Sequence, residues 1–356
     1  MEVLSLLGGC LEIVAEIALQ RWKLRKMPSL EQTGGSLQGK TCIVTGPTSG
    51  IGQATAEELC RRGAAVILAC RSQQRGDALV AKLRHQAQQR HQKAPDCQVL
   101  LLDLSSLASV RSFAAAWRSQ NRPLHRLINN AGLFTIGGAR RVNADGAEEH
   151  MATNHLGHFL LTLLLLPSMK QGSQPGDPAR IVSVSSRLHL LGKLDPRDMQ
   201  LSSSPPLVSL RNYSNSKLAQ VMMTAELRRR LGADSGIIAF AVHPGEVLTD
   251  VVRSLPPPMP RLYRWVFLHI LLTMQEGARA SVFCASTDLA KVADTAEPQY
   301  CYVDSDCRRQ YLMPAHQPSI SRFGRWRMGS IRTLNGPYRP MVHLQAIDVF
   351  HACRRS

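Results

Sequence analysis

The sequence predicts an α/β fold in which a mostly parallel, seven-stranded sheet is covered by helices on both faces. Three observations support this prediction. Short, continuous apolar runs alternate with longer helical stretches, as in parallel sheets that are buried on both faces. A glycine-rich turn follows the first apolar run, and the chain carries no internal repeat. Because crossovers between parallel strands are right-handed, we expect one doubly wound domain of the Rossmann type.

The expected strands and helices follow one another along the chain. The strands are the apolar runs at 41–45, 64–70, 98–104, 126–132, 180–186, 237–245 and 300–303. The helices are a first one carrying Ala54, Ala56 and Leu59, then 73–92, 107–119, 150–169, 212–231 and 275–286. Stretches rich in proline, glycine and serine at 172–178 and 202–207 are typical of turns inside a domain.

The composition suits one large domain with extensions. The chain has 356 residues, of which 44% are hydrophobic and 19% charged, so a sizeable core can be buried. The net charge is +17. From Arg308 onward, nine arginines stand against one acid, Asp348. Much of the excess therefore belongs to a basic tail, and there is no aromatic-studded basic stripe of the kind that binds single-stranded nucleic acid. We expect no nucleic-acid partner; salt-sensitive RNA or DNA binding by the tail is the alternative.

The nine cysteines are scattered along the chain. None has Cys-x-x-Cys spacing and no Cys/His cluster resembles a zinc site, so no bound metal is expected. Cys42 and Cys70 lie in apolar runs. We expect them to be reduced thiols of the core, which fits a protein that faces the cytosol.

The N-terminal segment, residues 1–37, is expected to associate with a membrane. It is apolar over 3–19 but carries Glu12 and Glu16, which a spanning helix would normally exclude. Basic residues follow at 21–26, so a helix lying in the membrane surface is favoured. A transmembrane anchor, a soluble helix and an organelle transit segment are alternatives. The expected location is the cytosolic side of the endoplasmic reticulum membrane, with another organelle membrane or the cytoplasm as alternatives.

The turn from Thr45 to Gly52, TGPTSGIG, lies between a strand and a helix, where phosphate binding requires it. Gly46 permits the tight turn, Gly50 lets the backbone approach a pyrophosphate, and Gly52 allows close packing of helix on strand. The helix N-terminus then faces the negative charge. The other expected contacts in this turn are Thr48, Ser49 and Ile51.

The end of the second strand indicates which dinucleotide is bound. NAD binders carry an acid there for the adenosine ribose. This chain has Arg71 at that position and no acid before Asp77. Arginine cannot accept a hydrogen bond from the ribose hydroxyls but pairs well with a 2′-phosphate. We therefore predict NADP(H) as the cofactor; the alternative is that Arg71 is merely solvated.

Four motifs occur in the order found in one known family. They are TGPTSGIG at 45–52, NNAG at 129–132, YSNSK at 213–217 and HPGEVLT at 243–249. Over about residues 38–305 the chain resembles the short-chain dehydrogenases/reductases. The segments LACRSQQRG, LDLSSLASVRSF and NHLGHFLLTLLLLP are most similar to the retinol dehydrogenase-like branch of membrane-associated enzymes with lipophilic substrates. The resemblance implies that 38–305 is a Rossmann domain with oxidoreductase activity.

The resemblance also implies a catalytic tetrad, which by motif position falls on Asn154, Ser186, Tyr213 and Lys217. A free tyrosine has a pKa of about 10. A lysine one helical turn away and the positive ring of the cofactor would lower that pKa, so that Tyr213 exchanges a proton with the substrate oxygen. Ser186 would hydrogen-bond the same oxygen, and Asn154 would hold a water that relays protons from Lys217. Ser185 is adjacent, and only the motif favours Ser186.

Further cofactor contacts follow from the same resemblance. Asp103 and Leu104, at the end of the third strand, match the family's adenine site; a helix N-terminal acid is the alternative for Asp103. The remaining contacts are Asn130, Ala131 and Gly132 after the fourth strand, Tyr213 and Lys217 of the tetrad, and Pro244, Gly245 and Thr249 near the nicotinamide.

Residues 246–274 are expected to form a lid over the substrate pocket. The apolar run 262–272 contains Tyr263, Trp265 and Phe267, which suits a pocket wall, a membrane contact or a dimer face. A core helix with a proline-rich lead-in is the alternative. Together with the N-terminal segment, this run favours a lipophilic substrate collected from a membrane.

The predicted function is an NADP(H)-dependent oxidoreductase that interconverts a lipophilic alcohol (retinoid, polyprenoid, sterol or similar) and its aldehyde or ketone by hydride transfer. The alternative is an inactive family member that acts as a scaffold or NADP sensor. The tail, 306–356, has little helical periodicity and no recognisable closing helix, so we expect it to be irregular. The expected partners are the substrate and a membrane surface, and a homo-oligomer is left open.

Overall fold

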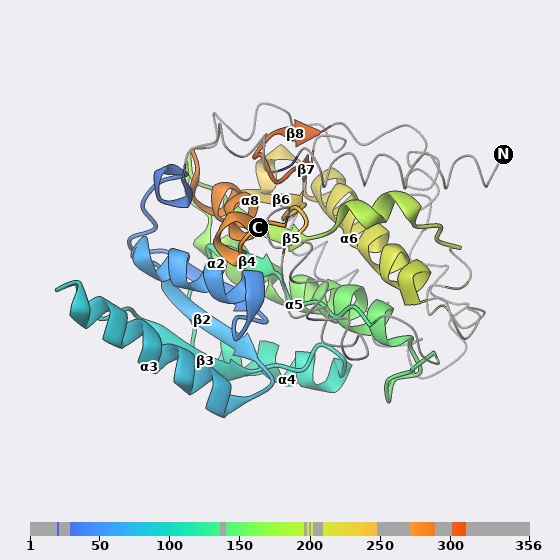
Figure 1. Ribbon diagram of the computed structural model, residues 1–356, viewed down its shortest axis with the longest axis horizontal. Helices are drawn as coiled ribbons and strands as arrows, with labels where there is room; N and C mark the ends of the chain where they lie inside the picture. Colours follow the sequence, from blue (N-terminus) through green and yellow to red (C-terminus); the bar gives the residue numbers. More distant parts are fainter. Residues whose placement is uncertain are drawn as a thin grey trace.

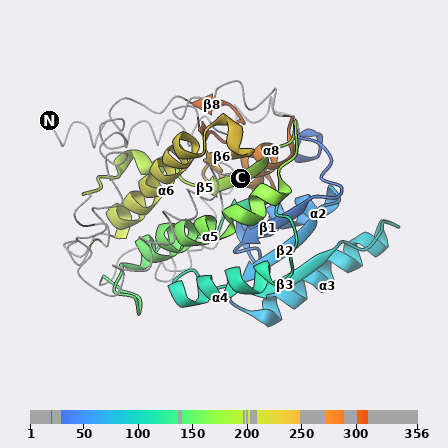
Figure 2. The same ribbon diagram turned by 180° about the vertical axis from the view of Figure 1, so that it is seen from behind.

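The computed structural model describes residues 20, 29–135, 140–195, 198, 201, 209–247, 271–288 and 301–310. They form one sheet between two layers of helices (Figures 1 and 2). The strands are β1 (Thr41–Thr45), β2 (Ala65–Cys70), β3 (Cys97–Leu101), β4 (Arg126–Asn129), β5 (Ala179–Val184), β6 (Ile237–Val242), β7 (Tyr302–Val303) and β8 (Arg309–Gln310). The α-helices are α2 (Gly50–Arg61), α3 (Gln73–Gln89), α4 (Leu107–Arg118), α5 (Gly157–Gly172), α6 (Ser209–Leu231) and α8 (Met274–Ser286). The shorter helical turns are η1 (Leu30–Gln32), η2 (Met151–Leu156), η3 (Arg187–Leu191) and η4 (Ala233–Ser235).

The sheet has the strand order β3-β2-β1-β4-β5-β6-β7-β8. Every neighbouring pair from β3 to β7 is parallel, whereas β8 pairs antiparallel with β7. The seven parallel strands expected from the sequence are therefore confirmed, and β8 adds a short polar strand that apolar patterning cannot reveal. The strand order reverses between β1 and β4, which is the place where open α/β sheets bind ligands.

The helices cover both faces of the sheet, as a doubly wound fold requires. One cluster of buried side chains joins α4, α5 and α6 to one face, and a second joins α2, α3 and α8 to the other. Alternate residues of β1 point to opposite clusters: Ile43 belongs to the first, and Cys42 and Val44 belong to the second. Because both faces are buried, the strand needs an unbroken apolar run.

Four strands end earlier than the apolar runs suggested. β3 ends at Leu101, β4 at Asn129, β5 at Val184 and β6 at Val242. Beyond β3, Leu102 and Leu104 are buried, so the apolar pattern continues after the ladder of backbone hydrogen bonds has stopped. The residues released from the strands form loops at the carboxyl edge of the sheet. The predicted cofactor contacts in these loops are Asp103, Leu104, Asn130, Ala131, Gly132, Pro244 and Gly245.

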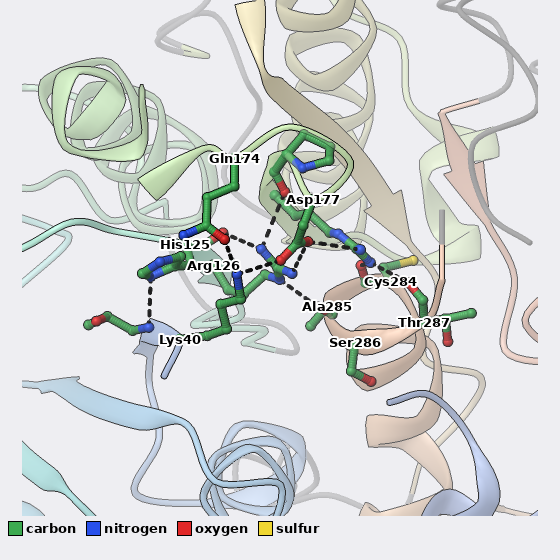
Figure 3. A network of polar contacts seen from close by, with 12 residues as sticks. Lys40, His125, Arg126, Gln174, Asp177, Cys284, Ala285, Ser286 and Thr287 are labelled. Atoms are coloured by element: carbon green, nitrogen blue, oxygen red, sulfur yellow. Dashed lines mark hydrogen bonds and ion pairs between the residues drawn. The ribbon is translucent and has the colours of Figure 1, made fainter. Parts of the chain in front are cut away.

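The amino edge of the sheet is held by a partly buried network of charges (Figure 3). Arg126 of β4 and Arg180 of β5 are neighbours in register. Arg126 Nε donates to the Ala285 carbonyl at 2.6 Å, and Arg180 Nη1 donates to two further carbonyls at the same end of α8. The Asp177 carboxylate accepts from both arginines and lies 2.7 Å from Lys40 Nζ. The network anchors α8, which packs against α2.

Several expectations fall outside the described residues. They concern the apolar stretch 3–19, the lid residues 248–270 with Thr249, and the tail beyond 310. Across the described ranges, no helix has the length and apolar character needed to traverse a bilayer. The domain boundaries at 37 and 305 stay predictions.

Candidate active site

The glycine-rich turn joins β1 to α2 at the carboxyl edge of the sheet. Gly46 and Gly50 have φ values of +63° and +58°, a region that side chains disfavour. A Cβ on Gly52 would lie 2.3 Å from the Gly46 carbonyl oxygen, so α2 approaches the strand this closely only with glycine. Ser49 precedes α2 without a side-chain bond to the helix, which leaves the first-turn amides available to an anion. Two more residues of the turn are partly exposed, Thr48 and Ile51.

The loop after β4 is hydrogen-bonded to this turn through Thr45. The Thr45 hydroxyl oxygen accepts from the backbone N–H groups of Asn130 and Ala131, each at 3.0 Å. Asn130 Nδ2 donates in return to the Thr45 carbonyl at 3.0 Å. The structure thus places the two predicted cofactor loops side by side.

Gly132 brings Asn154 and Lys217 together. A Cβ on this glycine would lie 3.4 Å from both Asn154 Oδ1 and Lys217 Nζ. The Leu133 N–H donates to Asn154 Oδ1 at 2.8 Å, and Asn154 Nδ2 donates to the Leu133 carbonyl at 3.0 Å. Asn154 Nδ2 also lies 3.0 Å from Ser216 Oγ. The Asn154 side chain is therefore fixed between the β4 loop and α6.

Asn154 lies in η2, a π-helical turn directly before α5. The sequence predicts one continuous helix over 150–169, and the structure confirms it, with helical residues from 149 to 172 and the π-helical turn as the irregular part. π-helical turns are rare and occur often at functional sites. Helix α5 then starts at Gly157, where a Cβ would lie 2.3 Å from the Leu104 carbonyl oxygen. This close approach seats the helix against the loop that follows β3.

Tyr213 and Lys217 lie one turn apart on α6. Lys217 Nζ is 5.6 Å from the centre of the Tyr213 ring. The buried ammonium donates to the Val184 carbonyl at 2.8 Å and to Gln220 Oε1 at 3.0 Å. The Phe134 ring covers Tyr213, with 4.5 Å between ring centres. The lysine is thereby held between the end of β5 and the phenol.

The structure distinguishes the two neighbouring serines at the end of β5. The Ser186 side chain acts on the Tyr213 phenol to lower its pKa and accepts from the Leu188 N–H at 3.2 Å. The Ser185 hydroxyl instead donates to the Lys217 carbonyl at 3.0 Å. Ser186 therefore faces the phenol, whereas Ser185 anchors the backbone of α6.

The surroundings of Tyr213 within the protein raise the pKa of its phenol. Burial is the largest cause and the Glu246 carboxylate adds to it, while the hydrogen bond from Ser186 opposes both. Burial also lowers the pKa of Lys217 to about 7. The expectation that Lys217 and the positive ring of the cofactor together lower the pKa of Tyr213 stays a prediction. A phenol whose pKa is raised therefore lies beside an amine whose pKa is lowered.

The loop after β6 is held from two directions. Pro244 and Gly245 are buried, and Gly245 has a φ of +81°. The Glu246 carbonyl accepts from the Leu272 N–H at 2.9 Å, and the Glu246 N–H donates to Gln20 Oε1 at 2.9 Å. A residue of the N-terminal segment thus contacts the loop expected near the nicotinamide.

The residues expected around the adenosine lie after β2 and β3. Arg71 is exposed directly after β2. Arg75 reaches from the first turn of α3 to the glycine-rich turn, where its Nη2 donates to the Thr48 carbonyl at 3.1 Å. Asp103 Oδ1 accepts from the amide and the hydroxyl of Ser105, at 2.9 and 2.7 Å. Asp103 is therefore held in a turn before α4 and is not the N-cap residue of that helix.

Residues of this edge that lie outside the set predicted from the sequence include Thr45, Arg75, Phe134 and Glu246. Arg75 is a second basic residue four positions after Arg71, a signal that the sequence carries. Glu246 is an acid that directly follows the Pro-Gly turn. The role of Thr45 depends on contacts with a distant loop, so the sequence offers no local signal for it.

Comparisons with known proteins agree with this arrangement. The family model described as short chain dehydrogenase matches residues 40–195. A dehydrogenase/reductase SDR family member, FEY, from Arabidopsis thaliana is 39% identical over 280 residues, which covers 77% of this chain and 73% of that protein. Retinol dehydrogenase 12 from Homo sapiens is 39% identical over 285 residues, covering 80% of this chain and 83% of that protein.

A solved structure has the same fold. The crystal structure of an uncharacterized protein from Mycobacterium Paratuberculosis aligns with a TM-score of 0.60 and 27% identity, covering 92% of this chain and 98% of that one. The strand order, the glycine-rich turn and these relatives lead to one conclusion: the chain belongs to the short-chain dehydrogenase/reductase family of oxidoreductases.

Proposed function

We propose that this chain is an NADP(H)-dependent oxidoreductase that interconverts a lipophilic alcohol and its aldehyde or ketone. The observation that carries the proposal is the convergence of a proton donor and its partners at one edge of the sheet, beside the glycine-rich turn. The residues that converge are Asn154, Ser186, Tyr213 and Lys217. Hydride chemistry at a carbonyl needs such a donor next to a bound dinucleotide.

The loops at this edge fit a dinucleotide. No side chain can stand between Gly52 and the Gly46 carbonyl, and Gly132 presents none toward Asn154 and Lys217. The glycine-rich turn, the loop 130–132 and the loop after β6 would hold the dinucleotide, which would supply or accept the hydride.

The protein side chains carry the proton. In carbonyl reduction, Tyr213 donates its phenolic proton to the substrate oxygen while Ser186 hydrogen-bonds the same oxygen. Burial, which raises the pKa of Tyr213, keeps the proton on the phenol until that oxygen becomes basic. Lys217, with a pKa of about 7, returns a proton along a path that Asn154 orders. Alcohol oxidation runs in the reverse direction.

Two arginines support NADP(H) over NAD(H). Arg71 is exposed where the adenosine ribose is expected, and Arg75 ties the start of α3 to the Thr48 carbonyl. Their guanidinium groups suit a 2′-phosphate, which offers two or more acceptor oxygens to a planar donor. The loop after β2 carries no acid to bind the ribose hydroxyls.

A lipophilic substrate is supported by an apolar wall at the reacting group. The Phe134 ring lies against Tyr213, so the phenol has an apolar neighbour. One relative is named a retinol dehydrogenase. Gln20, a residue of the segment proposed to lie on a membrane surface, contacts Glu246 at the catalytic edge.

The test uses the purified full-length chain in lipid vesicles with NADPH or NADH. The substrates are a retinoid aldehyde, a polyprenoid aldehyde, a sterol ketone and a short water-soluble aldehyde. We expect turnover of at least one lipophilic compound and a Kd for NADPH about tenfold or more below that for NADH. Equal or NADH-favouring affinities would overturn the NADP(H) assignment. NADPH binding without turnover of any compound would indicate a sensor or scaffold.

The membrane part of the proposal is tested separately. Deleting residues 1–27 should release the protein from vesicles in a pelleting assay. Unchanged pelleting of the shortened chain would contradict a membrane role for this segment.

A further inference from the structure

His158, on the first turn of α5, is fully buried between the catalytic turn and the nucleotide-binding turn. Its Nδ1 lies 3.0 Å from the Asn154 carbonyl oxygen, and its Nε2 lies 2.9 Å from the Thr45 hydroxyl oxygen. The first contact is inside the π-helical turn that carries Asn154. The second is at Thr45, which is the last residue of β1 and the first residue of the glycine-rich turn. One imidazole ring therefore joins the two parts of the site.

Hydrogen-bonding chemistry fixes the tautomer of this ring. A backbone carbonyl only accepts, so His158 Nδ1 must carry a proton. Burial lowers the pKa of His158 to about 3, so the ring is neutral and Nε2 accepts from the Thr45 hydroxyl. The Ile128 carbonyl also lies near that hydroxyl but is farther away, at 3.4 Å.

Thr45 transmits this constraint to the loop after β4. Since its proton points to His158, the Thr45 oxygen uses its lone pairs for the N–H groups of Asn130 and Ala131. A continuous series of hydrogen bonds thus runs from Asn154 to the loop expected to hold the cofactor. The imidazole is rigid, so its size sets the separation of the two parts.

We propose that His158 is a positioning residue for the reaction, holding the Asn154 turn at a fixed separation from the nucleotide-binding loops. The expected effect of His158 on kcat rests on the oxidoreductase function proposed above. Misplacing catalytic groups by about 1 Å can cost about a hundredfold in rate, so an effect on kcat is expected even though His158 donates no proton to substrate.

A neighbouring histidine supplies a matched control. His155 is also buried, its pKa is lowered to about 4 by burial, and its ring stacks on Phe159 at 5.9 Å. Among the described residues, its Nδ1 has no hydrogen-bond partner. Replacing His155 therefore changes the packing of the same helix without breaking the series of bonds.

The kinetic test compares His158→Leu, His158→Asn and His155→Leu, each first shown to be folded by thermal unfolding. We expect His158→Leu to lower kcat about tenfold or more with the KM for substrate within about twofold. His158→Asn retains a donor for the Asn154 carbonyl but has no acceptor that reaches the Thr45 hydroxyl, so kcat should stay lowered about as far as in His158→Leu. His155→Leu should stay within about twofold. The proposal is overturned by a folded His158→Leu with wild-type kcat, by an equal loss in His155→Leu, or by full recovery of kcat in His158→Asn.

A second test does not depend on activity. The ¹⁵N resonances of His158, identified as those that vanish in His158→Leu, should show a neutral ring protonated at Nδ1 that does not titrate between pH 5 and pH 9. A ring protonated at Nε2, or one titrating at about 6.5, would overturn the proposal. If the wild-type protein turned over no carbonyl compound, this result would still decide the role of His158, while the proposed function alone would fail.

Discussion

The Ser186 side chain, at the end of β5, interacts with the Tyr213 phenol at the start of α6 and acts to lower its pKa. The next serine back, Ser185, bonds the carbonyl of Lys217 on the same helix. Of these two adjacent residues, Ser186 therefore acts on the phenol and Ser185 holds the backbone of α6. The sequence motif favours Ser186 over Ser185, and this geometry gives that preference a physical basis.

The serine pair predicts unequal kinetic effects. Ser186→Ala removes a donor to the substrate oxygen and should lower kcat about a hundredfold. Ser185→Ala removes only the bond to the Lys217 carbonyl, so kcat should stay within about threefold and the free energy of unfolding should fall by about 1 kcal/mol. Steady-state kinetics and denaturant unfolding of both variants check this. Equal losses of kcat would contradict the assignment.

The Glu246 carboxylate predicts a shift in pH dependence. It raises the pKa of Tyr213, so Glu246→Gln should lower that pKa. Alcohol oxidation requires the deprotonated phenol, and the rise of kcat/KM with pH should therefore move to lower pH in this variant. Glu276→Gln, a change in the capping box at the start of α8, is the control and should leave the profile in place. A Glu246→Gln profile that matches wild type, or moves to higher pH, would refute the prediction.

We expect replacement of Arg71 to weaken the binding of NADPH selectively. Arg71→Ala should raise the Kd for NADPH about tenfold or more, because a charge-assisted bond to the 2′-phosphate is lost. The Kd for NADH, which has no such phosphate, should change less than about twofold. Fluorescence titration with both dinucleotides measures this, with Arg84→Ala farther along α3 as the control. If the Kd values for NADPH and NADH rose by the same factor, Arg71 would not bind the 2′-phosphate.

Asp177 predicts a loss of stability in acid. Burial opposes its ionisation, but Lys40 and Arg126 outweigh burial and lower its pKa to about 2. Because the folded pKa lies below the unfolded value, the stabilisation is complete above about pH 4 and is lost as pH falls toward about 2. Asp177→Asn should reduce the free energy of unfolding at pH 7 by about 2 kcal/mol and flatten its dependence between these pH values.

Asp96 provides the comparison for that measurement. Its carboxylate is 71% exposed and lies 3.7 Å from Arg122, so Asp96→Asn should change stability by less than about 0.5 kcal/mol. Urea unfolding across the pH range tests both variants. Similar behaviour of the two would contradict a special role for the network at the amino edge.

The fold could be predicted from the sequence because burial on both faces leaves a clear pattern. Continuous apolar runs mark β1 and β2, and the glycines between β1 and α2 mark the turn. The ends of the strands were predicted less accurately, because Leu102 and Leu104 remain buried after β3 has ended. The short strand β8 is polar and depends on a turn, so hydrophobic patterning does not indicate it.

The candidate site was predictable where motifs fix spacing along one helix or turn, as for Tyr213 and Lys217. Interactions between distant segments were not predictable. The pKa of Tyr213 depends on burial and on Glu246, which lies in another loop. The π-helical turn at Asn154 and the contacts of His158 likewise require the folded arrangement, because the sequence there reads as an ordinary apolar helix.

The central claim is that Tyr213 transfers the proton while hydride moves, and Tyr213→Phe tests it most directly. NADPH oxidation in the presence of a lipophilic aldehyde should be followed for wild type and variant, together with the Kd for NADPH. Removal of the phenolic hydroxyl should lower kcat about a thousandfold and leave the Kd within about threefold. A folded Tyr213→Phe variant that turns over as fast as wild type would contradict the account.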